Sequence, residues 1–517
     1  MRKFIYTLVL GAFACSSMSA ADQLIQTRPE GTAYESMSRS GKGYFMYLTA
    51  TLPTVVAGQK AEVVVGKNGD FYIYNPFSQL DTKTWLKGTI DSDGNVTIPT
   101  PQYIYREVDG TQIHDLYAVR MKPSEIPGDY NFEKDEEESD LKFIWKDNVL
   151  TQVGDGILGL AYIDGEFRGY ADSNIKIEPF TGVIVAPGNP DELTFNDYII
   201  GYSTHYETPS ATMAKLAFDD DEVWLTGFSK DLPDAWIHGT YDGTSIIFES
   251  NQYLGLYDGM YYAYFYGATA YVGQNEQGTP ETMYRLDDIL ICEENSKKGY
   301  SSEDVFLINS GNRESKYLFV LSRPDINPYE TKERYPMLPN ITGFTQINPS
   351  EQIGLGQFSF ALDPIDCYGN EFLDPEKLFY TIYVNDESNP LILKKSQFPK
   401  WVSEDTSEIP YSFSDGVQEW TIMPFFNEFN LLFMDSSWTR IGVKAIYKEG
   451  GKSLETPVAW SNEPAPNWPE VSVESIVADT EGDAEYYDLT GRRVENPSNG
   501  IFIVKFANGK VAKKVIR

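Results

Sequence analysis

An internal repeat of about 150 residues constrains the fold of this chain more than any other sequence feature. One copy contains YIYNPFSQLDTKTWLKGTIDSDGNVTIPTPQYI at residues 72–104, and the other contains VWLTGFSKDLPDAWIHGTYDGTSIIFESNQYLG at residues 223–255. The period indicates duplication of a whole domain, because solenoid repeats are roughly 20–50 residues long. The aligned positions keep a separation of 150 or 151 residues: Phe77 and Phe228, Trp85 and Trp236, Gly88 and Gly239, Thr89 and Thr240, and Gln102-Tyr103 and Gln252-Tyr253.

Each copy has the pattern of an antiparallel β-sheet. Asp93-Gly94-Asn95 in the first copy and Asp242-Gly243 in the second are hairpin turn signals, and the strand after each turn alternates apolar and polar residues. These patterns predict two similar antiparallel β domains at residues 22–190 and 191–340. Further strands are expected at residues 116–121, 143–150, 261–266 and 283–292.

The composition supports an all-β chain. It contains 35 Tyr and 29 Phe, which favour strands, whereas long helical patterns rich in Ala, Leu, Glu and Lys are nearly absent. Short strand candidates at residues 358–362, 378–384, 420–423, 431–433, 440–447 and 456–460 predict a β-sandwich at residues 341–465. The segment RIGVKAIYKEGGKSLETPVAW, residues 440–460, resembles the final hairpin of fibronectin type III-like modules, and this resemblance implies a fold but no activity.

The C-terminal residues 470–517 predict a small β-meander after a Pro-rich linker. Strands are expected around Tyr486 to Leu489, Ile501 to Phe506 and Val511 to Ile516, with a hairpin turn at Asn508-Gly509. The elements YDLTGRRV, GIFIV and a lysine-containing last strand resemble the C-terminal sorting domain of the type IX secretion system. That resemblance implies that export machinery recognises the tail, and that the protein is secreted or held at the outer cell surface. The alternative is a variant tail that packs against the preceding domain. The duplicated unit also resembles a repeat of exported bacterial proteins that carry such tails.

The N-terminus predicts a signal peptide at residues 1–21. Arg2 and Lys3 precede an apolar run from Phe4 to Phe13, and Ser19-Ala20-Ala21 fits a cleavage site. Cys15 raises the alternative of a lipid anchor. No other stretch approaches the length of a transmembrane helix, so we expect none in the mature chain.

The chain is strongly acidic, with a formal charge of −34. This charge repels nucleic acid and anionic lipid, so neither is an expected partner. Cys292 and Cys367 remain after leader removal, and they could form a disulfide in an oxidising compartment or stay as free thiols. Neither has a CxxC neighbour, so no zinc site is expected.

The sequence contains none of the common catalytic motifs, so no enzyme activity, cofactor or metal is predicted. The three histidines, His114, His205 and His238, form no motif. The segment Asp91-Ser92-Asp93-Gly94-Asn95 has the alternating carboxylates of a calcium loop but is too short for one, and a hairpin turn is preferred. Asp219-Asp220-Asp221-Glu222 and Glu136-Glu137-Glu138 are interpreted as solvated loops.

The candidate ligand-binding residues are Tyr262, Tyr264 and Tyr266, which would share one face of a strand. Exposed aromatic rings stack on sugar faces, and tyrosine adds a hydroxyl group. The alternative is that these tyrosines are ordinary strand residues at the edge of the core. The sequence therefore predicts an exported non-enzymatic protein for binding, adhesion or structure, whose partner is a glycan or another surface protein. The rival hypothesis is a secreted glycan-binding accessory protein or a glycoside hydrolase.

Overall fold

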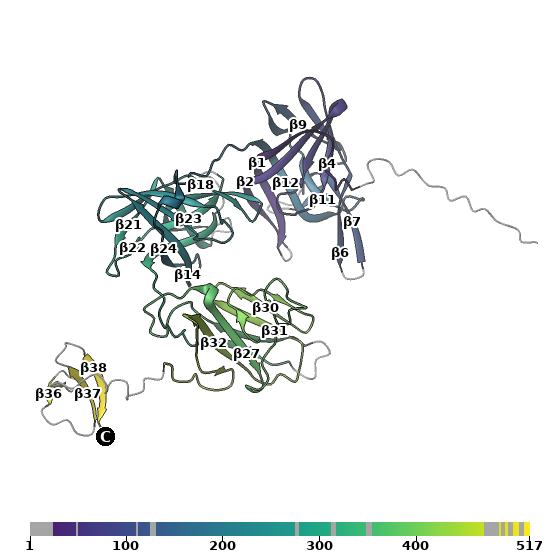
Figure 1. The fold of residues 1–517 in the computed structure, drawn as a ribbon. Helices are drawn as coiled ribbons and strands as arrows, with labels where there is room; N and C mark the ends of the chain where they lie inside the picture. The colour runs from purple at the N-terminus through teal and green to yellow at the C-terminus, as the bar shows by residue number, and fades with distance from the viewer. Residues whose placement is uncertain are drawn as a thin grey trace, which may run out of the picture. The chain divides into compact units, whose positions relative to one another are not determined.

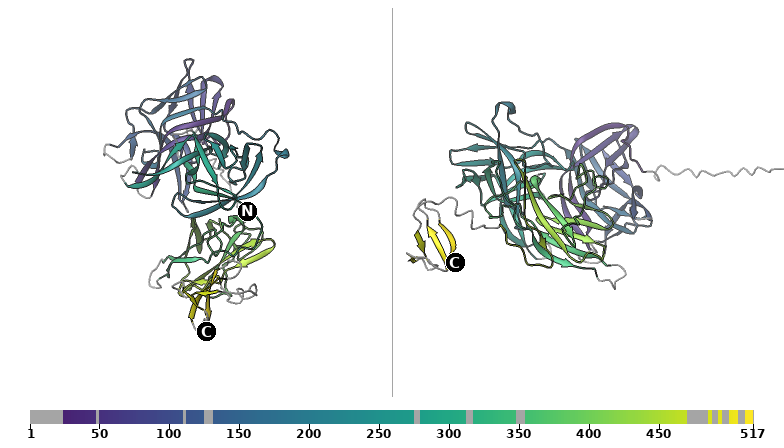
Figure 2. Two further views of the ribbon diagram at one scale, coloured as in Figure 1. Left: turned by 90° about the vertical axis from the view of Figure 1, so that its left-hand side faces the viewer. Right: turned by 60° about the horizontal axis from the view of Figure 1, so that its bottom comes forward.

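The computed structural model describes residues 24–47, 50–109, 112–124, 131–274, 279–311, 317–347, 354–469, 485–487, 492–494, 500–505 and 511–516. The predicted leader, Cys15 and the segment 470–484 lie outside the described residues. Strands dominate the described chain, which confirms the all-β class (Figures 1 and 2). In these ranges, no helix is long and apolar enough to cross a membrane. The chain divides into two compact units, one of residues 1–207 and 212–329, and one of residues 208–211 and 330–517.

The first repeat copy, strands β1–β12, contains a closed antiparallel sheet of eight strands. Following the hydrogen-bonded neighbours, the ring runs β2-β3-β4-β5-β9-β10-β12-β1 and returns to β2. Closure leaves these strands without a free edge, and their inward side chains form a core that includes Val63, Phe71, Ile98 and Phe143. The bounds are β1 Gly31–Tyr47, β2 Ala50–Gly66, β3 Asp70–Tyr74, β4 Trp85–Ile90, β5 Asn95–Pro99, β6 Gln102–Asp109, β7 Gln112–Pro123, β8 Phe132–Lys134, β9 Asp140–Lys146, β10 Val149–Val153, β11 Ile157–Ala161 and β12 Phe167–Pro179, with the 3-10 turn η2 at Lys67–Gly69.

Two long strands of copy 1, β1 and β12, continue from the closed sheet into a second sheet. Their pairing shifts register between Ser40 and Lys42, opposite Asn174, whose φ is 54°. Beyond this bulge, β12 pairs with β11, β11 with β7, and β7 with both β6 and β8. A smaller core containing Tyr44, Met121 and Phe132 lies on this sheet. The bulge therefore redirects two continuous strands from one core to another.

The second copy, strands β13–β24, repeats this pairing scheme. The pairs β14–β15, β15–β16, β16–β17, β17–β21, β21–β22 and β22–β24 correspond to successive neighbours of the closed sheet in copy 1. Arg323, with a φ of 50°, stands where copy 1 has Asn174. The bounds are β13 Asn196–Ser203, β14 Pro209–Asp219, β15 Glu222–Thr226, β16 Trp236–Tyr241, β17 Ser245–Glu249, β18 Gln252–Tyr257, β19 Tyr261–Gln274, β20 Pro280–Asp287, β21 Ile289–Glu294, β22 Tyr300–Ser301, β23 Val305–Ser310 and β24 Tyr317–Pro328, with η3 at Pro190–Glu192.

The repeated glutamine has the same structural role in both copies. The Gln102 amide accepts from the Lys87 backbone N–H at 3.0 Å and donates to the carbonyls of Lys87 and Pro99, both at 2.6 Å. The Gln252 amide accepts from the His238 N–H at 2.8 Å and donates to the carbonyls of His238 and Glu249 at 2.8 and 2.6 Å. Each side chain satisfies backbone groups of the Trp-containing strand, which explains why both copies carry a glutamine at this position.

Two of the strand predictions are wrong, because the structure contains two separate strands where each prediction has a single one. The expected strand at 143–150 is divided by Asp147 and Asn148, whose φ values of 52° and 62° form a tight turn between β9 and β10. The expected strand at 283–292 is divided at Asp288 between β20 and β21, which pair with different strands. A two-residue Asp-Asn turn was the available signal in the first case.

In the second unit, two sheets pack on one core. One sheet has the order β25-β26-β31-β30-β29, and the other has the order β28-β27-β32-β33, with β34 also paired to β32. Phe358 and Phe429 of the first sheet meet Tyr380 and Val443 of the second in the core between them. The strand β25, absent from the predicted set, is one edge of the first sheet. The bounds are β25 Asn340–Thr345, β26 Gly356–Ala361, η4 Pro375–Lys377, β27 Leu378–Val384, β28 Ile409–Pro410, β29 Asp415–Gly416, β30 Trp420–Phe425, β31 Glu428–Phe433, β32 Ile441–Glu449, β33 Lys452–Glu455 and β34 Ala459–Trp460.

The described part of the tail forms a four-stranded antiparallel sheet in the order β36-β35-β37-β38. Its strands are β35 Glu485–Tyr487, β36 Arg493–Val494, β37 Gly500–Lys505 and β38 Val511–Ile516. β36 was not predicted. The expected turn at Asn508-Gly509 lies outside the described residues.

Candidate ligand groove between the repeat copies

A groove of about 730 Å³ lies within the first unit, where the two repeat copies meet. Its volume falls within the range of ~300–1,000 Å³ for small-molecule sites. Copy 1 contributes β1, β2 and β12, copy 2 contributes β19, and the connector after β12 contributes one side. The lining residues are Ser38, Ser40, Gly41, Val55, Val56, Ala57, Gly58, Lys176, Glu178, Pro179, Phe180, Thr181, Gly182, Tyr262, Tyr264 and Gly311.

Backbone contacts bring the two copies together beside the groove. Gln59 of β2 pairs with Tyr261 of β19, and the Lys60 N–H donates to the Met260 carbonyl at 2.7 Å. Gly58, with a φ of 60°, lies so close to Gly311 that a Cβ on Gly58 would stand 2.2 Å from the Gly311 nitrogen. Only glycine fits this approach, so the contact depends on the sequence at both positions.

The structure places the three predicted tyrosines on one face of β19, but it does not expose them all. Tyr266 is fully buried in a cluster with Val305 and Leu307, and its hydroxyl donates to Asn251 at 2.7 Å. Tyr262 is only 5% exposed, whereas Tyr264 is half-buried. The expectation of three exposed rings is therefore wrong, because Tyr266 packs among side chains of the neighbouring strands β23 and β24, and Tyr262 is almost fully buried. Tyr262 and Tyr264 line the groove, and Tyr266 does not.

Phe180, which the sequence did not single out, covers Tyr262. Their rings are parallel to within 1°, with centroids 3.5 Å apart, and Phe180 also meets Tyr253 at 4.9 Å. On another side, a Cβ on Gly182 would lie 2.3 Å from the Phe180 ring. The Phe180 ring thus stacks on Tyr262, and its outer end lies against Gly182. In the sequence, the one local sign that Phe180 covers another ring is a large apolar residue in a connector that also contains the exposed residues Thr181 and Val183.

The groove has both aromatic and polar walls. On the strand pair β1–β12, Ser38 stands opposite Glu178, and Ser40 stands opposite Lys176. Lys176 and Glu178 form an ion pair at 2.6 Å. Burial raises the pKa of both Tyr253 and Tyr262 to about 12, so their hydroxyls stay protonated at neutral pH. The groove therefore offers hydroxyl groups and one internally neutralised charge pair.

A buried ion pair lies on the other side of the same strands. Arg39 contacts Asp172 at 3.0 Å, and their side chains are 3% and 2% exposed. Arg39 donates to the Pro76 carbonyl at 2.6 Å, and Asp172 accepts from the Ser78 N–H at 3.1 Å. Burial raises the pKa of Asp172, although Arg39 and the Ser78 N–H oppose this change. These contacts fix the loop that carries the repeat residue Phe77.

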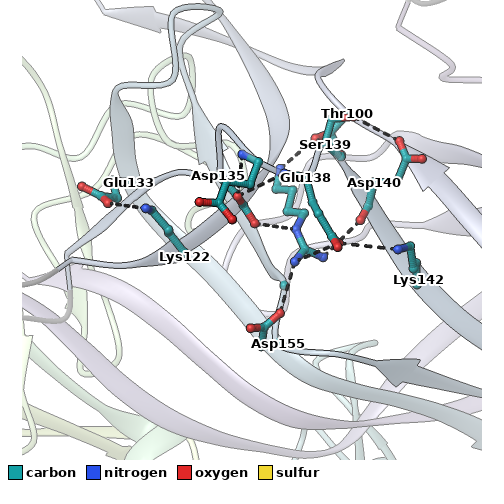
Figure 3. A network of polar contacts seen from close by, with 12 residues as sticks. Thr100, Lys122, Glu133, Asp135, Glu138, Ser139, Asp140, Lys142 and Asp155 are labelled. Carbon is teal, nitrogen blue, oxygen red and sulfur yellow. Dashed lines mark hydrogen bonds and ion pairs between the residues drawn. The ribbon is translucent and has the colours of Figure 1, made fainter.

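A second polar network surrounds Arg120 of β7 (Figure 3). Its guanidinium contacts Asp135 at 2.8 Å and both Glu138 and Asp155 at 3.2 Å. Glu138 also contacts Lys142 at 3.5 Å. The hydrogen bond from Arg120 is the main influence that holds the pKa of Asp135 below its usual range. The acidic segment predicted to be a solvated loop is thus partly tied to the sheet by one arginine.

The other candidate sites have structural contacts. Asp91 accepts from the backbone N–H groups of Asp93 and Asn95, both at 2.9 Å, as in a hairpin turn. His205 lies 2.8 Å from the Tyr284 hydroxyl, and His238 is half-buried. Cys292 and Cys367 are free thiols in different units. Within the described ranges, no group of three or more His, Cys, Asp or Glu side chains is arranged to hold a metal.

The fold and the groove define an all-β protein with a mixed aromatic and polar concavity between its repeat copies. Comparison with known proteins adds no relative, since no family model, curated protein or solved structure matches this chain.

Proposed function

We propose that this chain is an exported, surface-associated, non-enzymatic binding protein that acts in adhesion or ligand capture. The groove between the repeat copies is the proposed binding site. The observation that carries this proposal is that both copies and their connector contribute to one concavity, which contains two of the three candidate tyrosines. A duplicated scaffold with a site at its junction needs both copies to bind.

The charges in the groove support binding rather than catalysis. Glycoside hydrolysis requires two carboxyl groups about 5–10 Å apart across the scissile bond. Among the lining residues within the described ranges, Glu178 is the one carboxylate, and it is paired with Lys176. This arrangement favours the binding hypothesis over the hydrolase hypothesis.

The two C-terminal parts support display at a surface. The sheet orders β25-β26-β31-β30 and β27-β32-β33 correspond to the ABED and CFG orders of immunoglobulin-like sandwiches, which agrees with a fibronectin type III-like spacer. The small sheet of the tail agrees with a sorting domain. Deletion of residues 486–517 should move the protein from the surface fraction to the periplasm of the producing cell. Unchanged surface exposure after this deletion would remove the sorting role.

Filling the groove tests the binding role. Thr181 is exposed and lines the groove, so Thr181→Trp should obstruct it without altering the core. Val183, 75% exposed in the same connector but absent from the lining, provides the matched control Val183→Trp. The full mature chain would be applied to wells coated with neutral polysaccharides, acidic polysaccharides or collagen. We expect Thr181→Trp alone to lose binding, and equal retention by both variants would refute the groove as the site.

A further inference from the structure

We propose that the groove binds a short, uncharged oligosaccharide, with one sugar ring against Tyr264 and its hydroxyl groups on the β1–β12 wall. This inference rests on the proposed function, because it names the class of ligand for the same site.

The aromatic wall is a set of rings in mutual contact, and Tyr264 is its partly exposed tyrosine. Phe180, Tyr262 and Tyr253 contact one another, and Tyr253 also contacts Tyr264 with centroids 5.4 Å apart. Tyr264 is half-buried and lines the groove, so part of its surface remains free. A ring that is already fixed by its neighbours loses little side-chain entropy when an apolar sugar face stacks on it.

The opposite wall presents a compact set of hydrogen-bonding groups. Along β1, Met37 and Arg39 are buried, so alternation directs Ser38 and Ser40 to the other face. Along β12, Ile175 and Ile177 are buried, so Lys176 and Glu178 are directed to the same side. Because these strands pair in register, each serine is directly opposite one charged residue. Two hydroxyls, one ammonium and one carboxylate provide the donors and acceptors that a polyol can use.

The electrostatics favour an uncharged ligand. Lys176 and Glu178 neutralise each other at 2.6 Å, so the lining residues that the structure describes supply no unpaired charge for an anion. The chain as a whole carries −34, which repels acidic polysaccharides before they reach the groove. An extended peptide is the competing ligand class, because β-strands border the groove.

The test uses the full mature chain on an array that contains neutral oligosaccharides, acidic oligosaccharides and extended uncharged peptides. Titration calorimetry with the strongest neutral ligand then compares wild type with Tyr264→Ala and with Ser38→Ala/Ser40→Ala. Tyr271→Ala is the control, because Tyr271 belongs to the same strand, is 49% exposed and does not line the groove. Hydrogen exchange of β19 verifies that the variants remain folded.

We expect Tyr264→Ala to raise Kd by about tenfold, or ~1.4 kcal/mol, and the serine pair to raise it similarly, with Tyr271→Ala unchanged. A selective response to acidic oligosaccharides or to peptides would overturn the ligand class. Equal affinity of wild type and Tyr264→Ala would overturn the stacking position. If no neutral sugar binds but Thr181→Trp still abolishes binding to another coated probe, the sugar inference fails and the proposed function stands. If Thr181→Trp affects no binding at all, both fail.

Discussion

Copy 1 has a buried ion pair at two positions where copy 2 has two apolar residues. The strand registers show which residues correspond in the two copies. Arg39 is opposite Ile177 in copy 1, and Ile200 is opposite Ile326 at the equivalent position in copy 2. In the same way, Asp172 is opposite Leu158 in copy 1, and Leu321 is opposite Phe306 in copy 2. Thus copy 2 has Ile200 and Leu321 where copy 1 has Arg39 and Asp172. Ile200 and Leu321 are 0% and 1% exposed. The same scaffold evidently accepts either pair, so their stabilities can be compared within one protein.

Breaking the pair should cost more than replacing it. In Asp172→Leu, the Arg39 guanidinium remains buried without a counter-charge, and we expect a loss of about 3–5 kcal/mol in the free energy of unfolding. In Arg39→Ile/Asp172→Leu, two hydrogen bonds to the loop at Pro76 and Ser78 are lost, at about 0.5–1.5 kcal/mol each. Removing two charges from the interior offsets this loss by about 1–4 kcal/mol. The double variant should therefore lie between about 2 kcal/mol less stable and about 3 kcal/mol more stable than wild type.

The assay is hydrogen exchange by mass spectrometry on peptides from β1, β12 and residues 75–80, with urea unfolding of the full chain alongside. A change of ~1.4 kcal/mol alters the open population tenfold, so Asp172→Leu should speed exchange by about a hundredfold or more. The control pair is Arg106 and Asp115, which are 2.8 Å apart but have side chains that are 50% and 42% exposed. Their double-mutant cycle should give less than about 1 kcal/mol of coupling.

Additivity of the two single substitutions at Arg39 and Asp172 would refute this reasoning. Additive costs would mean that the charges do not compensate each other, and that the loop hydrogen bonds alone determine stability. A harmless Asp172→Leu would refute it equally, since it would show that Arg39 reaches water.

Three further predictions follow from other contacts. Gln252→Leu removes three hydrogen bonds to the backbone and should cost about 1–3 kcal/mol, seen as faster exchange in β16 and β18. Because the folded pKa of Asp135 is lowered, its contribution to stability is complete above the unfolded pKa of about 3.9 and is lost as pH falls through the folded value. Acid should therefore lower the protection of residues 131–140 relative to the intrinsic exchange rate at each pH, and Arg120→Met should remove this loss of protection. Burial raises the pKa of Cys292 to about 12, so iodoacetamide at pH 8 should alkylate the half-buried Cys367 first; equal rates would contradict its burial.

Local sequence signals predicted those elements whose causes are local. The turn at Asp93-Gly94-Asn95 and the strand at 378–384 depend on residues within a few positions, and the structure contains both. The boundary between β9 and β10 was missed although its cause is local, because Asp147-Asn148 was not interpreted as a turn. β-Branched and aromatic residues on both sides of Asp147-Asn148 favour a single continuous strand, so the turn was not predicted.

The site depended on contacts that a linear pattern does not contain. Alternation correctly placed Tyr262, Tyr264 and Tyr266 on one face, but it does not show what covers that face. Tyr266 is buried by β23 and β24, and Tyr262 is covered by Phe180 from the connector of the other copy.

The sequence by itself determined the all-β class, the repeat and the positions of its glutamine and glycine residues, because these follow from side-chain periodicity, turn chemistry and constant spacing. Only the tertiary structure decided which tyrosine remains accessible and where the groove lies. Exposure is set by packing between segments far apart in the chain, and in this protein the two copies and their connector must meet before any concavity exists.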